Sequence, residues 1–319
     1  MTDLQVDAPA DIRQEKPSIN LVPVRKRTAA ARRDARTGWL LVTPAAVLVF
    51  AFVLVPLGFA VYISLTNWPL IGPYHFTGLA NYTGLVNNAV FSHALVYTVM
   101  YTAIVTPPIL VLGYLLALLV RSKRPGAVVF RTLFFIPFVV GITTESYMLV
   151  LELQPNSGSV DYILSALGLA SASTPWLVNT TLITLAASLL VVWFASGLDM
   201  VILMAGMQGI PQDVYEAASV EGASRWDKEV RVTLPLLRRP IALCLIITVI
   251  GSFLTFNQFY VLSQGGPGTS TDTVVMWLYQ TAFVQLHLGA ATAMAFVVIL
   301  VVGVLSVGQF MILRRDATQ

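Results

Sequence analysis

The sequence has little of what soluble enzymes and metal proteins use: one cysteine, three histidines and few charged residues. Cys244 has no second cysteine to pair with, so the chain has no internal disulfide and no cysteine metal cluster. His75, His93 and His287 are far apart and lack the spacing of metal ligands, so no metal site is expected. Charged residues make up 11% of the chain, against about 25% in soluble domains, which excludes an ordinary water-soluble fold.

Motifs of nucleotide binding and hydrolysis are also missing. The Gly-Lys pair of a phosphate-binding loop is absent, because none of the four lysines follows a glycine. There is no Gly-x-Ser-x-Gly turn, no His-Glu-x-x-His pair and no nucleophile placed beside a base. We therefore expect neither an enzyme activity nor a bound cofactor in this chain, and any ATP hydrolysis has to come from another chain.

Long apolar runs are abundant. Hydrophobic residues make up 56% of the chain, and the mean hydropathy is +0.77. A helix needs about 20 apolar residues to cross a bilayer, so the runs predict an all-α polytopic membrane protein with six transmembrane helices. The expected helices cover residues 39–65, 94–120, 128–151, 177–204, 241–262 and 289–313. Pro107 and Pro108 should kink or break the second helix.

The positions of the basic residues predict the topology. All nineteen lysines and arginines lie in four stretches, 13–36, 121–131, 225–239 and 314–315. Basic residues are retained on the cytoplasmic side of a membrane. Two crossings between successive stretches place both termini in the cytoplasm, together with the connection at about 206–240. We expect a disordered cytosolic tail at 1–38 and a six-helix domain at 39–315.

The connection between the fourth and fifth expected helices is polar and carries helix signals. Pro211 suits the first turn of a short helix over 212–221. Gly222 stands where a helix ends, often in the left-handed conformation that only glycine adopts cheaply. A second short helix should follow until Pro235.

The same connection contains Glu-Ala-Ala, two residues, an acid, Gly-Ala, and Leu-Pro about a dozen residues later. The residues are Glu216, Ala217, Ala218, Glu221, Gly222, Ala223, Leu234 and Pro235. The two adjacent alanines leave a flat surface for a partner, and the acids can pair with basic groups. Taken alone, these residues also fit an ordinary amphipathic connector. The pattern resembles the signature cytoplasmic loop in permease subunits of binding-protein-dependent ABC importers.

Four further blocks are similar to the carbohydrate-uptake, maltose-type branch of that family and occur in its order. They are residues 76–82, 130–137, 205–211 and 259–267. The sequence departs from the family at two positions. Glu221 stands where the family usually has aspartate, and Glu229 stands where it commonly has an aromatic residue. The second departure bears on how closely the loop packs on an ATPase.

The resemblance implies the type I permease fold of ABC importers and the transmembrane subunit of an ATP-driven sugar importer in the cytoplasmic (inner) membrane. Such a subunit forms half of the translocation path, and its loop around Gly222 couples to the ATPase. The implied partners are a second permease subunit, two ATPase subunits that use ATP and Mg²⁺, an extracytoplasmic solute-binding protein and the lipid bilayer. The substrate would be a sugar or related neutral solute, and no nucleic acid is expected.

Polar and aromatic residues within the crossings are candidates for the transport path, because polar groups are expensive in lipid and usually face the bundle. We expect the path to include Glu145, Trp193, Phe256, Asn257 and Tyr260, with Phe253 on the same helix face as the last three. Rings and an amide suit a sugar, although plain packing between helices explains such residues too. No lysine or arginine occurs at 132–224 or 240–313, which favours a neutral solute.

A self-contained, ion-coupled secondary transporter of a small solute is the alternative. It would need an ion-coupling site, for which the sequence offers only Glu145, Glu152 and Asp199. For Glu145 and Asp199 we expect a structural hydrogen bond or a contact with a partner subunit rather than proton relay.

Overall fold

The computed structural model describes residues 29–121, 126–169, 171 and 174–315. Its regular elements in these ranges are helices, as predicted, and the only strand-like pairs among them are two isolated bridges, Thr66 with Phe76 and Pro69 with His287. The chain divides into two compact units, residues 1–57 and 58–319.

The first unit contains α1 (Ala29–Val49), the π-helical turn η1 (Phe50–Leu54) and the start of α2 (Val55–Ser64). Helix α1 begins ten residues before the expected start at residue 39, because residues 29–38 include alanines and arginines, which favour helix. The rest of the predicted disordered tail, residues 1–28, lies outside the described residues.

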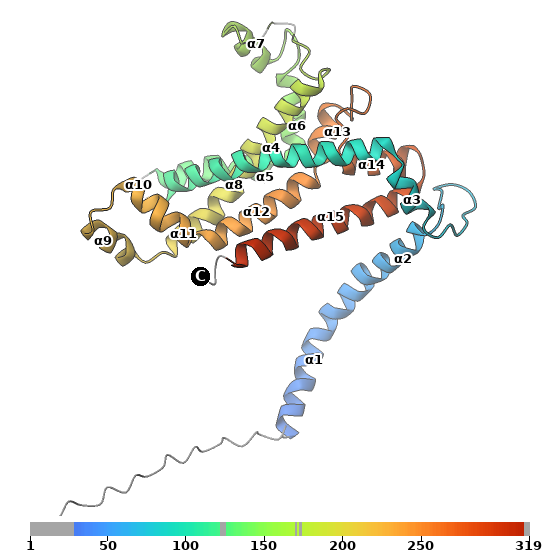
Figure 1. Cartoon of the computed structure of the whole chain (residues 1–319), viewed down its shortest axis with the longest axis horizontal. Coiled ribbons are helices and arrows are strands. Elements are labelled where there is room, and N and C mark those ends of the chain that lie inside the picture. Colours follow the sequence, from blue (N-terminus) through green and yellow to red (C-terminus); the bar gives the residue numbers. More distant parts are fainter. Residues whose placement is uncertain (1–28, 122–125, 170, 172–173, 316–319) are drawn as a thin grey trace, which may run out of the picture. The chain divides into compact units, whose positions relative to one another are not determined.

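The second unit, residues 58–319, contains the remaining helices (Figure 1). Their bounds are α3 (Ala80–Val86), α4 (Ala89–Val120), α5 (Ala127–Val140), α6 (Ile142–Glu152), α7 (Ser159–Ala166), α8 (Thr180–Gln208), α9 (Gln212–Val220), α10 (Arg225–Lys228), η2 (Glu229–Thr233), α11 (Leu234–Leu236), α12 (Arg238–Phe253), α13 (Asn257–Leu262), α14 (Val274–Tyr279), η3 (Gln280–Val284) and α15 (Leu288–Arg315).

Five stretches of the described chain are long and apolar enough to cross a membrane, and the bent pair α5–α6 makes a sixth if it counts as one span. The five are residues 38–64, 89–120, 180–208, 238–262 and 288–312. The predicted crossings are therefore found, with shifts of a few residues at their ends.

Helix α4 continues through Pro107 and Pro108 without a break, so of the predicted kink or break the break does not occur. Both prolines fix φ near the helical value, and each removes only one backbone donor. Beside the prolines, Val105 and Ile109 are buried in a cluster that includes Ile183 and Ala187 of α8, so α4 packs on α8 at this point.

The third crossing is not the single helix expected over 128–151. Helices α5 and α6 meet at Gly141 with a bend of 92°. Gly141 has a φ of +92°, which a residue with a side chain rarely adopts. Hydropathy carries no information about such a bend, because both halves are apolar.

Close approach between helices defines the core around α4. A Cβ atom added at Gly113 of α4 would lie 2.7 Å from the Cβ of Asp199 on α8. Small residues permit this kind of contact between membrane helices. Helix α12 contacts α4, α8 and α15.

Candidate functional site

The polar connection after α8 forms the helix–glycine–helix unit that the sequence predicts. Pro211 immediately precedes α9 with an extended ψ of 140°, and Asp213 lies in the first turn, where the helix dipole favours an acid. The helix ends at Val220, and Gly222 follows with a φ of +80°. A Cβ atom added at Gly222 would meet nothing within 4 Å, so the backbone angle rather than space is what requires glycine here.

A capping box starts the second part of the connection. The Ser224 hydroxyl accepts a hydrogen bond from the Asp227 backbone N–H at 3.1 Å, and the Asp227 carboxylate accepts one from the Ser224 N–H at 3.2 Å. The Ser224 hydroxyl also donates to the Asp227 carboxylate. This bond, the bond from the Ser224 N–H and the charge of Arg231 hold the pKa of Asp227 below its usual value. The Ser-x-x-Asp spacing is the local sequence signal for this box, which the predicted helix boundaries did not include.

The eight signature residues divide between the surface and the interior of this connection. Those exposed are Glu216, Ala217, Glu221 and Gly222, and those partly buried are Ala218, Ala223, Leu234 and Pro235. Two large apolar side chains beside them, Val220 and Trp226, are 90% and 76% exposed. The turn around Gly222 therefore presents small, acidic and apolar groups together.

The expected path residues of the fifth crossing lie at a break between α12 and α13. Phe256 and Asn257 line a cavity of about 200 Å³, together with the polar side chains of Thr248 and Gln258. The Phe256 ring stacks on Tyr260, with ring centroids 5.1 Å apart. Rings and amides are thus gathered at one mixed-polarity cavity.

Phe253 does not share this face, contrary to expectation. It is buried in an apolar cluster with Phe91, Val274 and Met294. The prediction assumed an unbroken helix, but α12 ends at Phe253 and α13 begins at Asn257, so helical spacing does not carry across the break.

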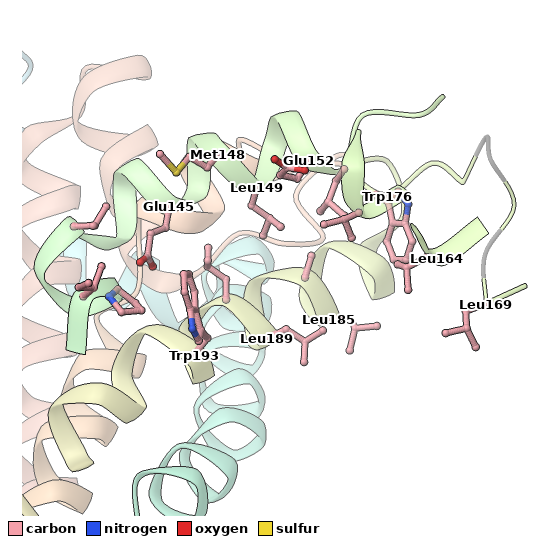
Figure 2. Close-up of a pocket in the computed structure, with 17 residues that line it drawn as sticks. Glu145, Met148, Leu149, Glu152, Leu164, Leu169, Trp176, Leu185, Leu189 and Trp193 are labelled. Atoms are coloured by element: carbon pink, nitrogen blue, oxygen red, sulfur yellow. The ribbon is translucent and has the colours of Figure 1, made fainter. Parts of the chain in front are cut away.

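The other two expected path residues line a separate cavity of about 660 Å³. Figure 2 shows Glu145 from α6 and Trp193 from α8 pointing into the space between these helices. Aliphatic side chains such as Leu189 form most of the remaining wall. The structure therefore does not bring all five expected path residues into one site.

The two membrane carboxylates have different surroundings. Asp199 accepts a hydrogen bond from the Thr248 hydroxyl at 3.3 Å, as expected for a structural role. Glu145 is 4% exposed, and neither of its oxygens has a hydrogen-bond partner in the part of the chain that the structure describes. The structural hydrogen bond expected for Glu145 is thus not found in these ranges.

Helices of membrane-spanning length, a helix–glycine–helix connection and cavities within the bundle define a polytopic membrane subunit of a transport system. The chain belongs to the family described as the inner membrane component of binding-protein-dependent transport systems, whose model matches residues 77–316. It is accordingly a multi-pass protein of the inner membrane.

Individual relatives agree with this family. The chain is 30% identical to a probable ABC transporter permease protein of Pyrococcus horikoshii, over 82% of this chain and 90% of that protein. It is also 30% identical to a trehalose/maltose transport system permease protein of Thermococcus litoralis, over 89% and 96% of the two chains. A lactose transport system permease protein of Rhizobium radiobacter is 29% identical, over 91% and 98%.

A solved structure shares the fold. It is a bacterial alginate ABC transporter in complex with an alginate pentasaccharide-bound periplasmic protein. The TM-score is 0.79 at 21% identity, and the alignment covers 91% of this chain and 98% of that one. The expected permease fold is therefore confirmed.

Proposed function

We propose that this chain is one of two transmembrane subunits in an ATP-driven importer of a sugar or related neutral solute. The observation that carries the proposal is the helix–Gly222–helix connection inside a family match over residues 77–316. The relatives named for trehalose/maltose and lactose support a carbohydrate substrate. The alginate neighbour imports an acidic polysaccharide, so the preference for a neutral solute rests on the missing lysines and arginines at 132–224 and 240–313.

Coupling is assigned to the connection around Gly222. Its exposed Glu216, Ala217 and Glu221 would meet an ATPase subunit, with Val220 and Trp226 supplying apolar contact. In this proposal the connection and both termini are cytoplasmic, as the basic residues predict. The chain binds no cofactor and performs no catalysis, and two ATPase subunits use the ATP and Mg²⁺.

The solute path is assigned first to the cavity beside the break in the fifth crossing. At this cavity Phe256, on which Tyr260 stacks, offers a ring to the C–H groups of a sugar, and Asn257 offers both a donor and an acceptor to its hydroxyls. Trp193 and Glu145 stay candidates for the path at the larger cavity, whose mainly aliphatic wall leaves hydroxyls with few partners. An extracytoplasmic binding protein would deliver the solute.

The test is purification of the tagged chain in mild detergent, followed by mass spectrometry and reconstitution into proteoliposomes. We expect a second permease, an ATPase and a solute-binding protein to copurify, and uptake to require both ATP and the binding protein. Recovery of the chain alone, with uptake driven by an ion gradient, would overturn the proposal.

A further inference from the structure

Glu229 joins the connection around Gly222 to the end of α4. Its carboxylate forms an ion pair with Arg121, the residue that caps α4, through Nη2 and Oε1. Arg121 Nη1 also donates to Oε2 at 3.3 Å, and the Tyr114 hydroxyl donates to the same oxygen at 3.2 Å. Both carboxylate oxygens are thus used, in the two-pronged geometry that makes arginine–carboxylate pairs specific.

This contact is more sheltered than an ordinary surface ion pair. The side chains of Arg121 and Glu229 are 34% and 18% exposed. The nearby pair of Arg231 with Asp227 has side chains that are 80% and 37% exposed, with Nε and Oδ1 3.5 Å apart. Exposed pairs contribute little because water and salt screen them, so the two pairs differ in the coupling they can supply.

Helix α9 is fastened to the same part of the connection. The hydroxyls of Tyr215 on α9 and Thr233 on η2 are 3.0 Å apart and share a hydrogen bond. Lys228 Nζ donates to the Ser219 hydroxyl at 2.6 Å, joining α10 back to α9. A movement of α9 is therefore transmitted to η2, which begins with Glu229, by these two hydrogen bonds as well as by the covalent backbone.

Helix α4 can carry such a movement across the protein. It has 32 residues, which is about 48 Å of helix. Near its other end, the Thr98 hydroxyl accepts a hydrogen bond from the Val274 N–H at the start of α14, 2.9 Å away. Helix α4 thus runs from the Glu229 contact to a segment that follows the loop after α13.

We infer that Glu229 is a positioning residue for transport: its contact with Arg121 and Tyr114 makes α4 follow the movement of the connection around Gly222. The inference rests on the proposed function. An aromatic residue at position 229, which the resembled family commonly has, could not accept all three hydrogen bonds. The contact of Glu229 with Arg121 and Tyr114 therefore depends on the glutamate that this chain has at position 229.

The test compares solute moved per ATP hydrolysed in the reconstituted complex. Glu229→Gln keeps the shape of the side chain but removes its charge, and we expect it to lower this ratio about 5- to 10-fold. ATP hydrolysis and recovery of the ATPase during purification should stay near wild type, because the contact faces α4. The charge-reversed pair Arg121→Glu with Glu229→Arg should recover much of the ratio, whereas either reversal alone should not.

Arg231→Gln is the matched control, since it removes a charge from the same turn but breaks only an exposed pair. We expect a change of less than about twofold. A wild-type ratio in Glu229→Gln would overturn the inference. Loss of the ATPase from Glu229→Gln during purification would also overturn it, because Glu229 would then be a docking residue. Loss of the single and the paired variants alike from the membrane would overturn it as well, because Glu229 would then be needed for folding. Failure of the proposed function is distinguishable, because the wild-type complex itself would then show no ATP-driven uptake.

Discussion

Gly113 of α4 lies so close to Asp199 of α8 that a methyl group at position 113 would come within 2.7 Å of the Asp199 Cβ. Gly113→Ala would therefore force the two helices apart, and we expect a loss of about 1–3 kcal/mol of stability. The thermal midpoint of the purified protein in detergent checks this. Gly303→Ala on α15 is the control, because nothing lies within 4 Å of the added atom. Equal midpoints for the two variants would contradict the close packing of α4 on α8.

At position 222 there is space for a side chain, but the backbone angle φ disfavours any residue other than glycine. Its φ of +80° costs an ordinary L-residue about 1–2 kcal/mol, and more for a β-branched residue. We expect Gly222→Val to reach the membrane at normal levels and to lose ATP-driven uptake. Gly222→Asn should keep part of the uptake, because asparagine visits the left-handed region more readily. Normal transport by the valine variant would refute the coupling role.

Asp272 makes stability depend on pH. Burial raises the pKa of this carboxyl, which lies in the loop after α13, to about 6, although a hydrogen bond from Gln280 opposes the shift. The folded protein thus holds the proton more tightly than the unfolded chain, whose aspartates titrate near about 3.9. Stability from this group is fully present below about pH 4 and is lost as the pH rises to about 6.

Asp272→Asn should remove that loss, because the amide stays neutral. The thermal midpoint of the variant, measured from pH 4 to pH 7, should fall less than that of the wild type and should be higher at pH 7. An unchanged pH profile would show that Asp272 does not titrate in this window.

Asn257 should contribute to solute transfer rather than to assembly. We expect Asn257→Ala to reduce uptake about 10-fold or more, because buried hydroxyls of the solute would lose a partner, while the complex still hydrolyses ATP. Uptake by proteoliposomes, with hydrolysis measured in parallel, checks this. Ile299→Ala on the exposed side of α15 serves as the control. If both variants transport normally, the cavity beside α13 is not the path.

The crossings and the helix–glycine–helix connection could be predicted because their signals are local. Long apolar runs predict α4, α8 and α15, and a glycine at position 222 predicts a residue in the left-handed conformation at the end of a helix. The bend at Gly141 and the break before Asn257 were missed, because hydropathy measures composition and not backbone angles. The contact of Glu229 with Arg121 joins residues 108 positions apart. Its only signal in the sequence is an acid at position 229, where the resembled family commonly has an aromatic residue.

The break between α12 and α13 also has a consequence for water. Backbone that leaves the helix at membrane depth needs partners, since lipid supplies none, and it occurs only against protein or a water-filled space. The Thr273 hydroxyl satisfies one such group, the carbonyl of Thr255, at 2.8 Å. The neighbouring cavity, with Asn257 in its wall, is where hydration would reach the rest. A hydroxyl-rich molecule in this cavity would offer these backbone groups the hydrogen bonds that water would otherwise supply.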